Sequence, residues 1–248
     1  MAPRFEDQWR TRFEEFAGQS DSDAGIAGWT TTGLDTRVRR FLGLWSSGPP
    51  DQRWLDAGCG AGTYIRILLD HQHEVVGVDY SLPTLRKAAA RGLRGAALVI
   101  ADVRTLPFRA GQFDGVLCFG VTQALAESAA AVHELARQVR PGGELWVDGL
   151  NRWCLLHVVG ALRRLLLGRP RHLRYESPWR IKRLCQECGF SDVRLYWMPI
   201  VPGRARRLQQ LIESPPLSWL LTYVPLFAMS ISHAFIVRAT GSKGRISG

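Results

Sequence analysis

The sequence has 248 residues and few cysteines. Its five cysteines are irregularly spaced, which excludes a disulfide framework, and there are too few His/Cys pairs for a zinc site. Cys185 and Cys188 form a single C-x-x-C near the expected end of a helix. We interpret them as ordinary reduced thiols, with redox or metal use as the alternative. We therefore expect no metal in the site.

The sequence also lacks internal repeats, low-complexity tracts and an apolar leader. Residues 1–12 carry charges of both signs without a short apolar core, so we expect a cytoplasmic location. Residues 214–237 contain no Asp, Glu, Lys or Arg, a length that could span a bilayer. Because Pro215, Pro216 and Pro225 interrupt this run, we expect a buried cap or a dimer contact instead. A loop that touches lipid or a hydrophobic substrate is the alternative.

Acidic residues are scarce in one part of the chain, which makes the net charge of +10 uneven. From residue 152 to residue 207 there are thirteen basic side chains and three acidic ones, so this segment holds an excess equal to the whole net charge. Residues 1–151 are nearly neutral. The segment also contains a leucine-rich helical stretch, residues 153–167, that runs into several arginines. An apolar face with a basic rim suits an anionic partner: a membrane surface, a lipid-linked sugar or isoprenoid, an acyl carrier protein or RNA. The alternative is a cap helix packed on a sheet.

The residues that are present alternate between strand-like and helix-like patterns. Apolar runs predict strands at residues 53–57, 74–79, 96–103, 113–119 and 144–148. Helical spacing predicts intervening helices at residues 63–71, 83–91 and 126–139. Strands that alternate with helices favour a parallel sheet covered on both faces. We therefore expect an α/β fold of doubly wound type.

Acidic residues and glycines follow three successive predicted strands. Asp56 leads into Gly58, Gly60 and Gly62, Asp79 ends the second strand, and Asp102 and Val103 end the third. In a parallel sheet these positions share the carboxyl edge, where ligands bind. Asp79 suits ribose hydroxyls, whereas Asp102 and Val103 suit an exocyclic amine and an adenine face. The pattern predicts a nucleoside site.

The spacing of the glycines narrows the choice of nucleoside. The third glycine lies one residue too early for the dinucleotide pattern G-x-G-x-x-G, and no P-loop pattern is present. An acid at the start of the loop also repels a pyrophosphate, while Asp56 could orient a cationic amino acid group. NAD and P-loop nucleotides are therefore disfavoured.

Five sequence blocks in register resemble class I S-adenosylmethionine-dependent methyltransferases over about residues 50–150. They are DAGCGAGT, VVGVDYS, ADVRTLPF, FDGVLCFG and RPGGELWVD. The resemblance is strongest to the branch with small-molecule acceptors, methyltransferase type 11, which includes quinone-biosynthesis methyltransferases. It implies a Rossmann-like, seven-stranded, mostly parallel sheet whose last strand is antiparallel, with strands six and seven near residues 189–197 and 232–239.

The same resemblance implies S-adenosylmethionine as the cofactor. Asp79 would hold the ribose, Asp102 the adenine amine, and the Gly58–Gly62 loop the methionine part, with Tyr80 and Phe119 packing nearby. Simple packing is the alternative reading for Tyr80. We divide the chain into an N-terminal helical lid (1–48), a cofactor-binding core (49–150) and cap segments with the last two strands (151–248).

Methyl transfer by direct displacement requires positioning, exclusion of water and at most a general base. Among His157, His172, Tyr175 and His233, we favour His157 as the base because it follows the fifth strand, although a structural role is the alternative for each. Gln123 follows the fourth strand, where related enzymes face their substrate, so we expect it to contact the acceptor.

The divergent segments favour a small, hydrophobic or lipid-linked acceptor, with O-methylation preferred and peripheral membrane contact left open. An RNA methyltransferase is less favoured, because Phe119 and the residues after it replace the N-P-P-Y or D-P-P-Y of amino-group-methylating branches. A non-catalytic nucleoside-binding module is the other alternative. The sequence does not indicate an oligomeric state.

Overall fold

A computed structural model of the chain describes residues 5–168, 173–201, 206–212 and 223–241, with residues 214, 217, 219 and 221. His172, Pro215 and Pro216 lie outside the described residues, as do three arginines of the basic segment 152–207: Arg169, Arg171 and Arg204.

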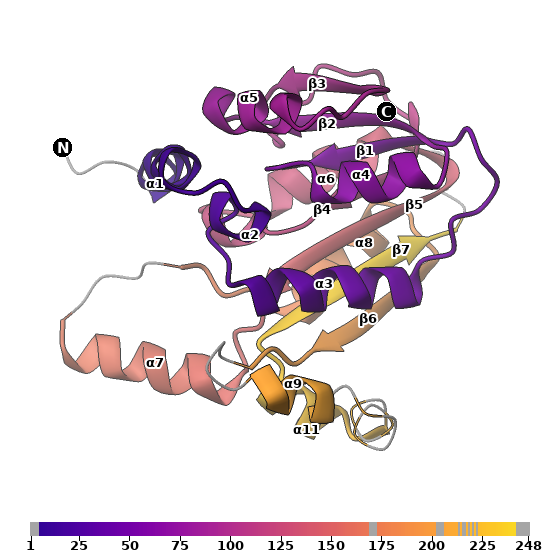
Figure 1. The fold of residues 1–248 in the computed structure, drawn as a ribbon. Helices are drawn as coiled ribbons and strands as arrows, with labels where there is room; N and C mark the ends of the chain where they lie inside the picture. Colours follow the sequence, from indigo (N-terminus) through magenta and orange to yellow (C-terminus); the bar gives the residue numbers. More distant parts are fainter. Residues whose placement is uncertain are drawn as a thin grey trace.

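One seven-stranded sheet has the order β3-β2-β1-β4-β5-β7-β6 (Figure 1). The strands are β1 (Arg53–Ala57), β2 (Glu74–Asp79), β3 (Ala96–Ile100), β4 (Phe113–Cys118), β5 (Val139–Leu150), β6 (Asp192–Met198) and β7 (Ala234–Thr240). Neighbouring strands pair in parallel except β7, which is antiparallel to both β5 and β6. The predicted Rossmann-like sheet with an antiparallel last strand is confirmed.

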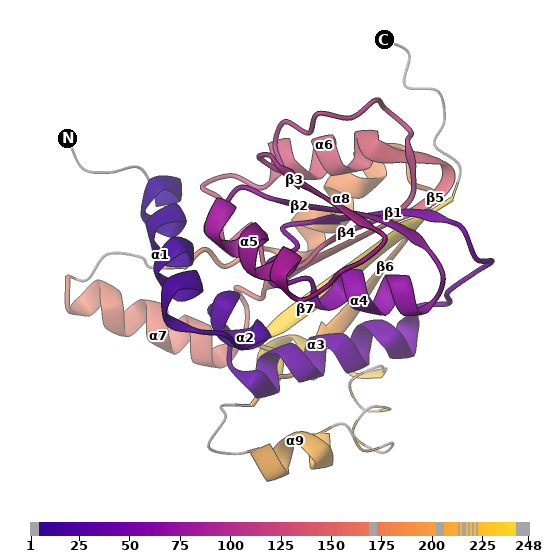
Figure 2. The same cartoon turned by 45° about the horizontal axis from the view of Figure 1, so that its top comes forward.

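Helices cover both faces of the sheet. On one face lie α3 (Thr31–Leu44), α4 (Thr63–Asp70) and α5 (Leu82–Ala90), and on the other lie α6 (Ala129–Gln138) and α8 (Pro178–Glu187) (Figures 1 and 2). Each face has its own apolar core. Phe41, Trp54 and Leu68 belong to the first core, and Val132, Leu135 and Ile181 belong to the second. Burial on both faces explains why the central strands read as continuous apolar runs.

The remaining helices lie at the carboxyl edge of the sheet or beyond it. They are α1 (Phe5–Gln19), α2 (Asp23–Ile26), the short 3-10 helix η1 (Thr122–Ala124), α7 (Leu155–Leu166), α9 (Arg206–Ile212) and α11 (Pro225–Ile231). In Figure 1, α7 projects away from the body of the protein. Among the described residues, no helix combines the length and the apolar character needed to cross a membrane.

The main differences from the predicted strand boundaries are at the end of β3 and the start of β5. β3 ends at Ile100 rather than at residue 103, because Asp102 Oδ1 accepts a hydrogen bond from the Arg104 amide and turns the chain. β5 begins at Val139 rather than at residue 144, and its pairing with β4 shifts register between Phe113 and Gly115. Residues 141–143, expected to separate the helix from the strand, therefore lie within β5.

The alternative in which the leucine-rich stretch packs on the sheet as a cap helix is wrong. This stretch forms α7, and His157 is its buried residue, while most of its leucines and valines are exposed. Helical spacing predicts that such a helix is amphipathic but not which way its apolar face points.

Candidate active site

A cavity of about 230 Å³ lies at the carboxyl edge of the sheet. Loops after β1, β2, β3 and β4 form its floor, and residues of α1 and α2 form its other wall. The lining includes most of the predicted cofactor residues: Gly58, Gly60, Asp79, Tyr80, Asp102, Val103 and Phe119. Two further predicted residues, Asp56 and Gly62, lie outside this lining.

The three glycines after β1 adopt left-handed conformations, with φ of +85° at Gly58, +51° at Gly60 and +82° at Gly62. A Cβ atom on Gly58 would lie 2.2 Å from the Val121 side chain, and one on Gly62 would lie 2.5 Å from Leu93. A Cβ on Gly60 would meet no protein atom within 4 Å. Gly58 and Gly62 are therefore needed for packing, whereas the missing side chain of Gly60 leaves room in the cavity.

Four amides of this loop donate hydrogen bonds within the protein. Gly58 and Cys59 donate to the Val78 carbonyl at 2.7 and 2.9 Å, Gly60 donates to Asp79, and Gly62 donates to the Cys59 carbonyl. A phosphate-binding loop needs such amides turned toward the ligand. The geometry therefore agrees with the sequence analysis, which disfavours a pyrophosphate site.

Asp79 is held in place by two backbone amides. Its Oδ2 accepts from Gly60 at 3.1 Å and its Oδ1 accepts from Ser81 at 2.9 Å. A carboxylate oxygen has a second lone-pair site, so each can still accept a hydroxyl donor from a ligand. Burial raises the pKa of Asp79 to about 6. The carboxylate is thus oriented for a diol and is ionised at neutral pH.

Asp56 is buried behind the glycine loop. Its Oδ2 has no hydrogen-bond partner within the part of the chain that the structure describes. Burial, and then repulsion from Asp79, raise the pKa of Asp56 to about 8. A nearby cation would stabilise the ionised form of this unpaired carboxyl group.

Asp102 is bound by an arginine that also contacts α1. Arg104 Nη2 lies 2.6 Å from Asp102 Oδ2, and Arg104 Nη1 lies 2.9 Å from Glu6 Oε1. The hydrogen bonds from Arg104 hold the pKa of Asp102 below its usual range. Arg104 itself lines the cavity and was missed by the sequence analysis, although it stands two residues after Asp102 in the third sequence block.

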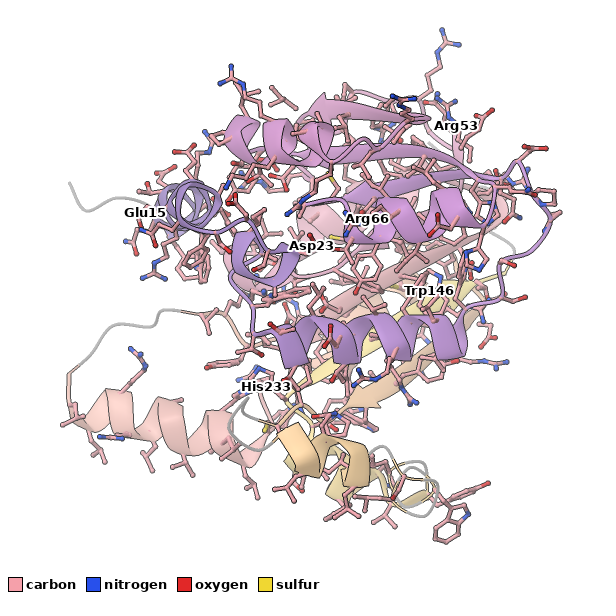
Figure 3. All side chains as sticks on the ribbon, in the orientation of Figure 1. Glu15, Asp23, Arg53, Arg66, Trp146 and His233 are labelled. Atoms are coloured by element: carbon pink, nitrogen blue, oxygen red, sulfur yellow. The ribbon has the colours of Figure 1, made fainter. Side chains whose placement is uncertain are left out.

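The N-terminal helices contact the cavity through aromatic and ionic groups. The Phe13 ring on α1 packs edge-to-face on Tyr80, with centroids 6.2 Å apart. On α2, Asp23 accepts a hydrogen bond from Thr63. Asp23 also pairs with Arg66, and Figure 3 labels both of these side chains. Arg91 pairs with the same carboxylate at 3.1 Å. These contacts hold residues 5–26 over the glycine loop.

Part of the cavity lining is apolar. It consists of Ile26, Ala27, Trp29, Val121, Ala124 and Leu125. Beneath it, Arg37 Nε and Asp148 Oδ2 form a buried ion pair at 2.9 Å, with the Arg37 guanidinium 4.2 Å from the Trp29 ring. Asp148 also accepts from the Gly120 amide at 2.6 Å. The sequence analysis missed this pair, whose members are 111 residues apart.

Gln123 lies on η1, next to Ala124 of the cavity lining, but is not itself part of that lining. Its side chain is buried, and its Oε1 has no hydrogen-bond partner among the described residues. Its carbonyl accepts from the Arg174 amide at 3.2 Å, and Arg174 Nη2 lies 2.8 Å from Glu176 Oε2. The contact of Gln123 with an acceptor stays a prediction.

His157 does not line the cavity, and both of its ring nitrogens have partners. Nδ1 lies 2.7 Å from the Asn151 carbonyl, so it must donate. Nε2 then accepts from His233 Nδ1 at 2.8 Å. Figure 3 shows His233 between α3 and the start of α7. Burial lowers the pKa of His157. Its role as a base stays a prediction, and the geometry gives it a structural partner in His233.

The described residues contain no cluster of three or more His, Cys, Asp or Glu side chains that could hold a metal ion. All five cysteines are buried and free. The site combines carboxylates, the arginines Arg10 and Arg104, glycine backbone, aromatic rings and apolar side chains.

Solved structures share this fold. The structure is similar to magnesium protoporphyrin IX methyltransferase from Synechocystis PCC 6803, with a TM-score of 0.64 and 16% identity. The similarity covers 96% of this chain and all of that chain. It also matches phosphoethanolamine N-methyltransferase 2 from Haemonchus contortus, at a TM-score of 0.64 and 18% identity over 97% of this chain and 60% of that one. The fold is that of the class I methyltransferases.

Sequence comparison identifies the domain. A family model described as a methyltransferase domain matches residues 55–147. Together with the fold and the five blocks, this match supports a class I methyltransferase domain over residues 55–147.

The curated relatives differ in how much of their length the chain covers. Ubiquinone biosynthesis O-methyltransferase from Aromatoleum aromaticum is 27% identical over 63% of this chain and 71% of its own length. Probable tRNA methyltransferase 9B from Bos taurus is 32% identical over 45% of this chain. The chain spans 23% of that tRNA methyltransferase relative.

Proposed function

We propose that the protein transfers a methyl group from S-adenosylmethionine to a small hydrophobic acceptor. The observation that carries this proposal is the mixed lining of one cavity. Asp79 and Asp102 line it beside the space left by Gly60, and Val121, Ala124 and Leu125 line it as well. A polar nucleoside and an apolar acceptor would both find matching side chains in this cavity.

The polar residues of the cavity lining fit S-adenosylmethionine. Asp79 is oriented to accept two ribose hydroxyls, and Val103 lies beside Asp102 on the cavity wall. The unpaired oxygen of Asp56 lies beneath the loop that would face a cationic methionine tail. When bound, S-adenosylmethionine supplies an activated methyl group, because its sulfonium sulfur leaves as the neutral thioether S-adenosylhomocysteine.

The rest of the site would position the acceptor and exclude water. The aromatic contact between Phe13 and Tyr80 and the ion pair between Glu6 and Arg104 would keep α1 over the cavity, as a lid. Gln123 could turn its unpaired amide oxygen toward a polar group of the acceptor. Because both nitrogens of His157 are engaged, an acceptor that arrives ionised, such as a phenolate, fits this site best. This favours O-methylation.

Two observations favour a small acceptor over RNA: the apolar residues in the cavity lining, and the share of each relative's length that this chain matches. The Aromatoleum O-methyltransferase relative is matched over most of its length, whereas the tRNA methyltransferase relatives are matched over less than a quarter. In addition, Arg174, Arg180, Arg183 and Arg194 of the basic segment pair with acidic side chains of this protein. These arginines are less available for RNA phosphates than the sequence indicates.

The proposal is tested by incubating the purified protein with methyl-labelled S-adenosylmethionine and a fractionated cell extract. We expect label in the lipid or small-molecule fraction, and none there with Asp79→Asn. Label confined to the RNA fraction would support the tRNA methyltransferase alternative and overturn the proposal. Binding of the cofactor without transfer to any fraction would support a non-catalytic module.

A further inference from the structure

The outward face of α7 is apolar. Six side chains on it are between 45% and 77% exposed: Leu155, Val158, Val159, Leu162, Leu165 and Leu166. Their spacing places them along one side of the helix. His157, on the opposite side, is buried against His233. A surface helix of a globular protein normally turns its apolar side inward, whereas α7 turns its apolar side toward solvent.

Neighbouring residues extend this apolar face. Trp153 and Trp179 are 44% and 48% exposed, and their rings pack edge-to-face with centroids 6.5 Å apart. Helix α11 packs against α7 and exposes Leu226. We call the exposed apolar side chains of α7, the two tryptophans and Leu226 the apolar platform. Exposed apolar side chains gathered along one helix face mark an interaction surface.

The sequence segments that form α7 and α11 carry no acidic charge. Residues 149–175 contain no Asp or Glu, and residues 223–237 contain none either. The acidic residues near Trp179 are Glu127 and Glu176, and both are paired with arginines. The Arg152 guanidinium lies 5.2 Å from the Trp153 ring, and Arg163 is exposed on α7. Basic side chains beside exposed leucines and tryptophans are typical of helices that lie in the interface of anionic membranes.

We propose that the apolar platform docks on the surface of an anionic lipid bilayer, with α7 lying in the plane of the interface. Anionic headgroups would neutralise Arg152 and Arg163 while the acyl chains cover the leucines. A second copy of the chain would bring like charges together, and RNA would leave the leucines without an apolar partner. The bilayer therefore satisfies both features of the surface.

The position of α7 connects the bilayer to the cavity. β5 is parallel to β4, so its carboxyl end at Leu150 lies at the same edge of the sheet as the cavity, and α7 begins at Leu155. If the proposed methyltransferase function holds, an acceptor dissolved in lipid would enter from the docked side. Docking itself does not depend on that function.

The test is sedimentation of the full-length protein with vesicles of phosphatidylcholine, with and without phosphatidylglycerol. We expect binding to the anionic vesicles that falls about tenfold or more in the double variant Leu162→Glu/Leu166→Glu, because two side chains leave the acyl region. Arg163→Glu should weaken binding to anionic vesicles and remove much of its salt dependence. Leu42→Glu, at an exposed leucine of α3, is the matched control and should bind as the unmodified protein does.

S-adenosylhomocysteine binding, measured by calorimetry without vesicles, separates this proposal from the proposed function. The double variant should keep that binding, since its changes lie outside the cavity. No sedimentation with anionic vesicles, or equal sedimentation of the double variant, would overturn docking even if the cofactor binds. Dimer formation in light scattering that the double variant abolishes, without vesicle binding, would assign the platform to a second copy instead.

Discussion

Helices α4 and α7 both follow a strand at the carboxyl edge of the sheet, and both are rich in leucine and isoleucine or valine. α4 turns Ile65 and Leu68 into the core and leaves its arginine, Arg66, to pair with Asp23. α7 exposes its apolar side chains and buries a histidine. The same periodicity therefore serves a folded core in one region and an external surface in the other.

The two regions use arginine as differently as they use leucine. Arg37 on α3 and Asp148 on β5 are almost fully buried, with exposures of 4% and 0%. Arg163 on α7 is exposed. The N-terminal and central part of the chain thus directs charge and apolar area toward the protein interior, whereas α7 directs both toward solvent.

The largest expected effect comes from the arginine comparison. Arg37→Met leaves Asp148 buried without its partner and should lower the free energy of unfolding by about 4 kcal/mol. Arg163→Met should change it by less than ~0.5 kcal/mol. Urea denaturation measures both. A cost at Arg163 equal to that at Arg37 would show that α7 packs on the protein.

The leucine comparison gives the next effect. Leu68→Ala removes a fully buried side chain and should cost about 3 kcal/mol. Leu162→Ala, on the exposed face of α7, should cost less than ~0.5 kcal/mol. The same denaturation experiment applies, and similar losses at the two positions would contradict the account of α7.

Within the glycine loop, the comparison is between packing and ligand space. Gly62→Ala meets Leu93 and adopts a left-handed conformation, so it should lower stability by about 2 kcal/mol. Gly60→Ala should cost only about 1 kcal/mol of conformational strain, but its methyl group enters the cavity and should weaken S-adenosylhomocysteine binding. Thermal denaturation and calorimetry separate the two effects. Unchanged affinity in Gly60→Ala would place the ligand elsewhere.

A smaller effect concerns pH. Asp79 must be ionised to accept two hydroxyl donors, and its pKa is raised to about 6. Affinity for S-adenosylhomocysteine should therefore be maintained above that pH and fall by about tenfold per unit below it. Asp56→Asn should keep this fall, because Asp56, with a pKa near 8, is already protonated there. An affinity that is flat between pH 7 and 5 would exclude Asp79 as the acceptor.

Local patterns were sufficient to predict the first five strands, whereas the last two strands and the antiparallel direction of the last one followed from the family resemblance. Each strand tip could be read from a short apolar run followed by a characteristic residue, and the structure brings Gly60, Asp79 and Asp102 to one cavity. These predictions succeed because parallel strands share an edge, so neighbouring motifs in the sequence become neighbours in space.

Contacts between distant segments could not be predicted in the same way. Arg37 pairs with Asp148 across 111 residues, and no local pattern distinguishes either residue from a surface charge. His157 illustrates the same limit, since its partner His233 stands 76 positions away. The direction in which α7 faces likewise depends on the shape of the surface beneath it rather than on its own periodicity.

The most direct measurement of the central claim is calorimetric titration of S-adenosylhomocysteine into the unmodified protein, Asp79→Asn and Asp70→Asn. Asp70 is an exposed acid at the end of α4 and serves as the matched control. We predict binding to the unmodified protein and to Asp70→Asn, and a loss of about a hundredfold in Asp79→Asn as two charged hydrogen bonds weaken. Absence of binding to the unmodified protein, or equal binding by Asp79→Asn, would contradict the account.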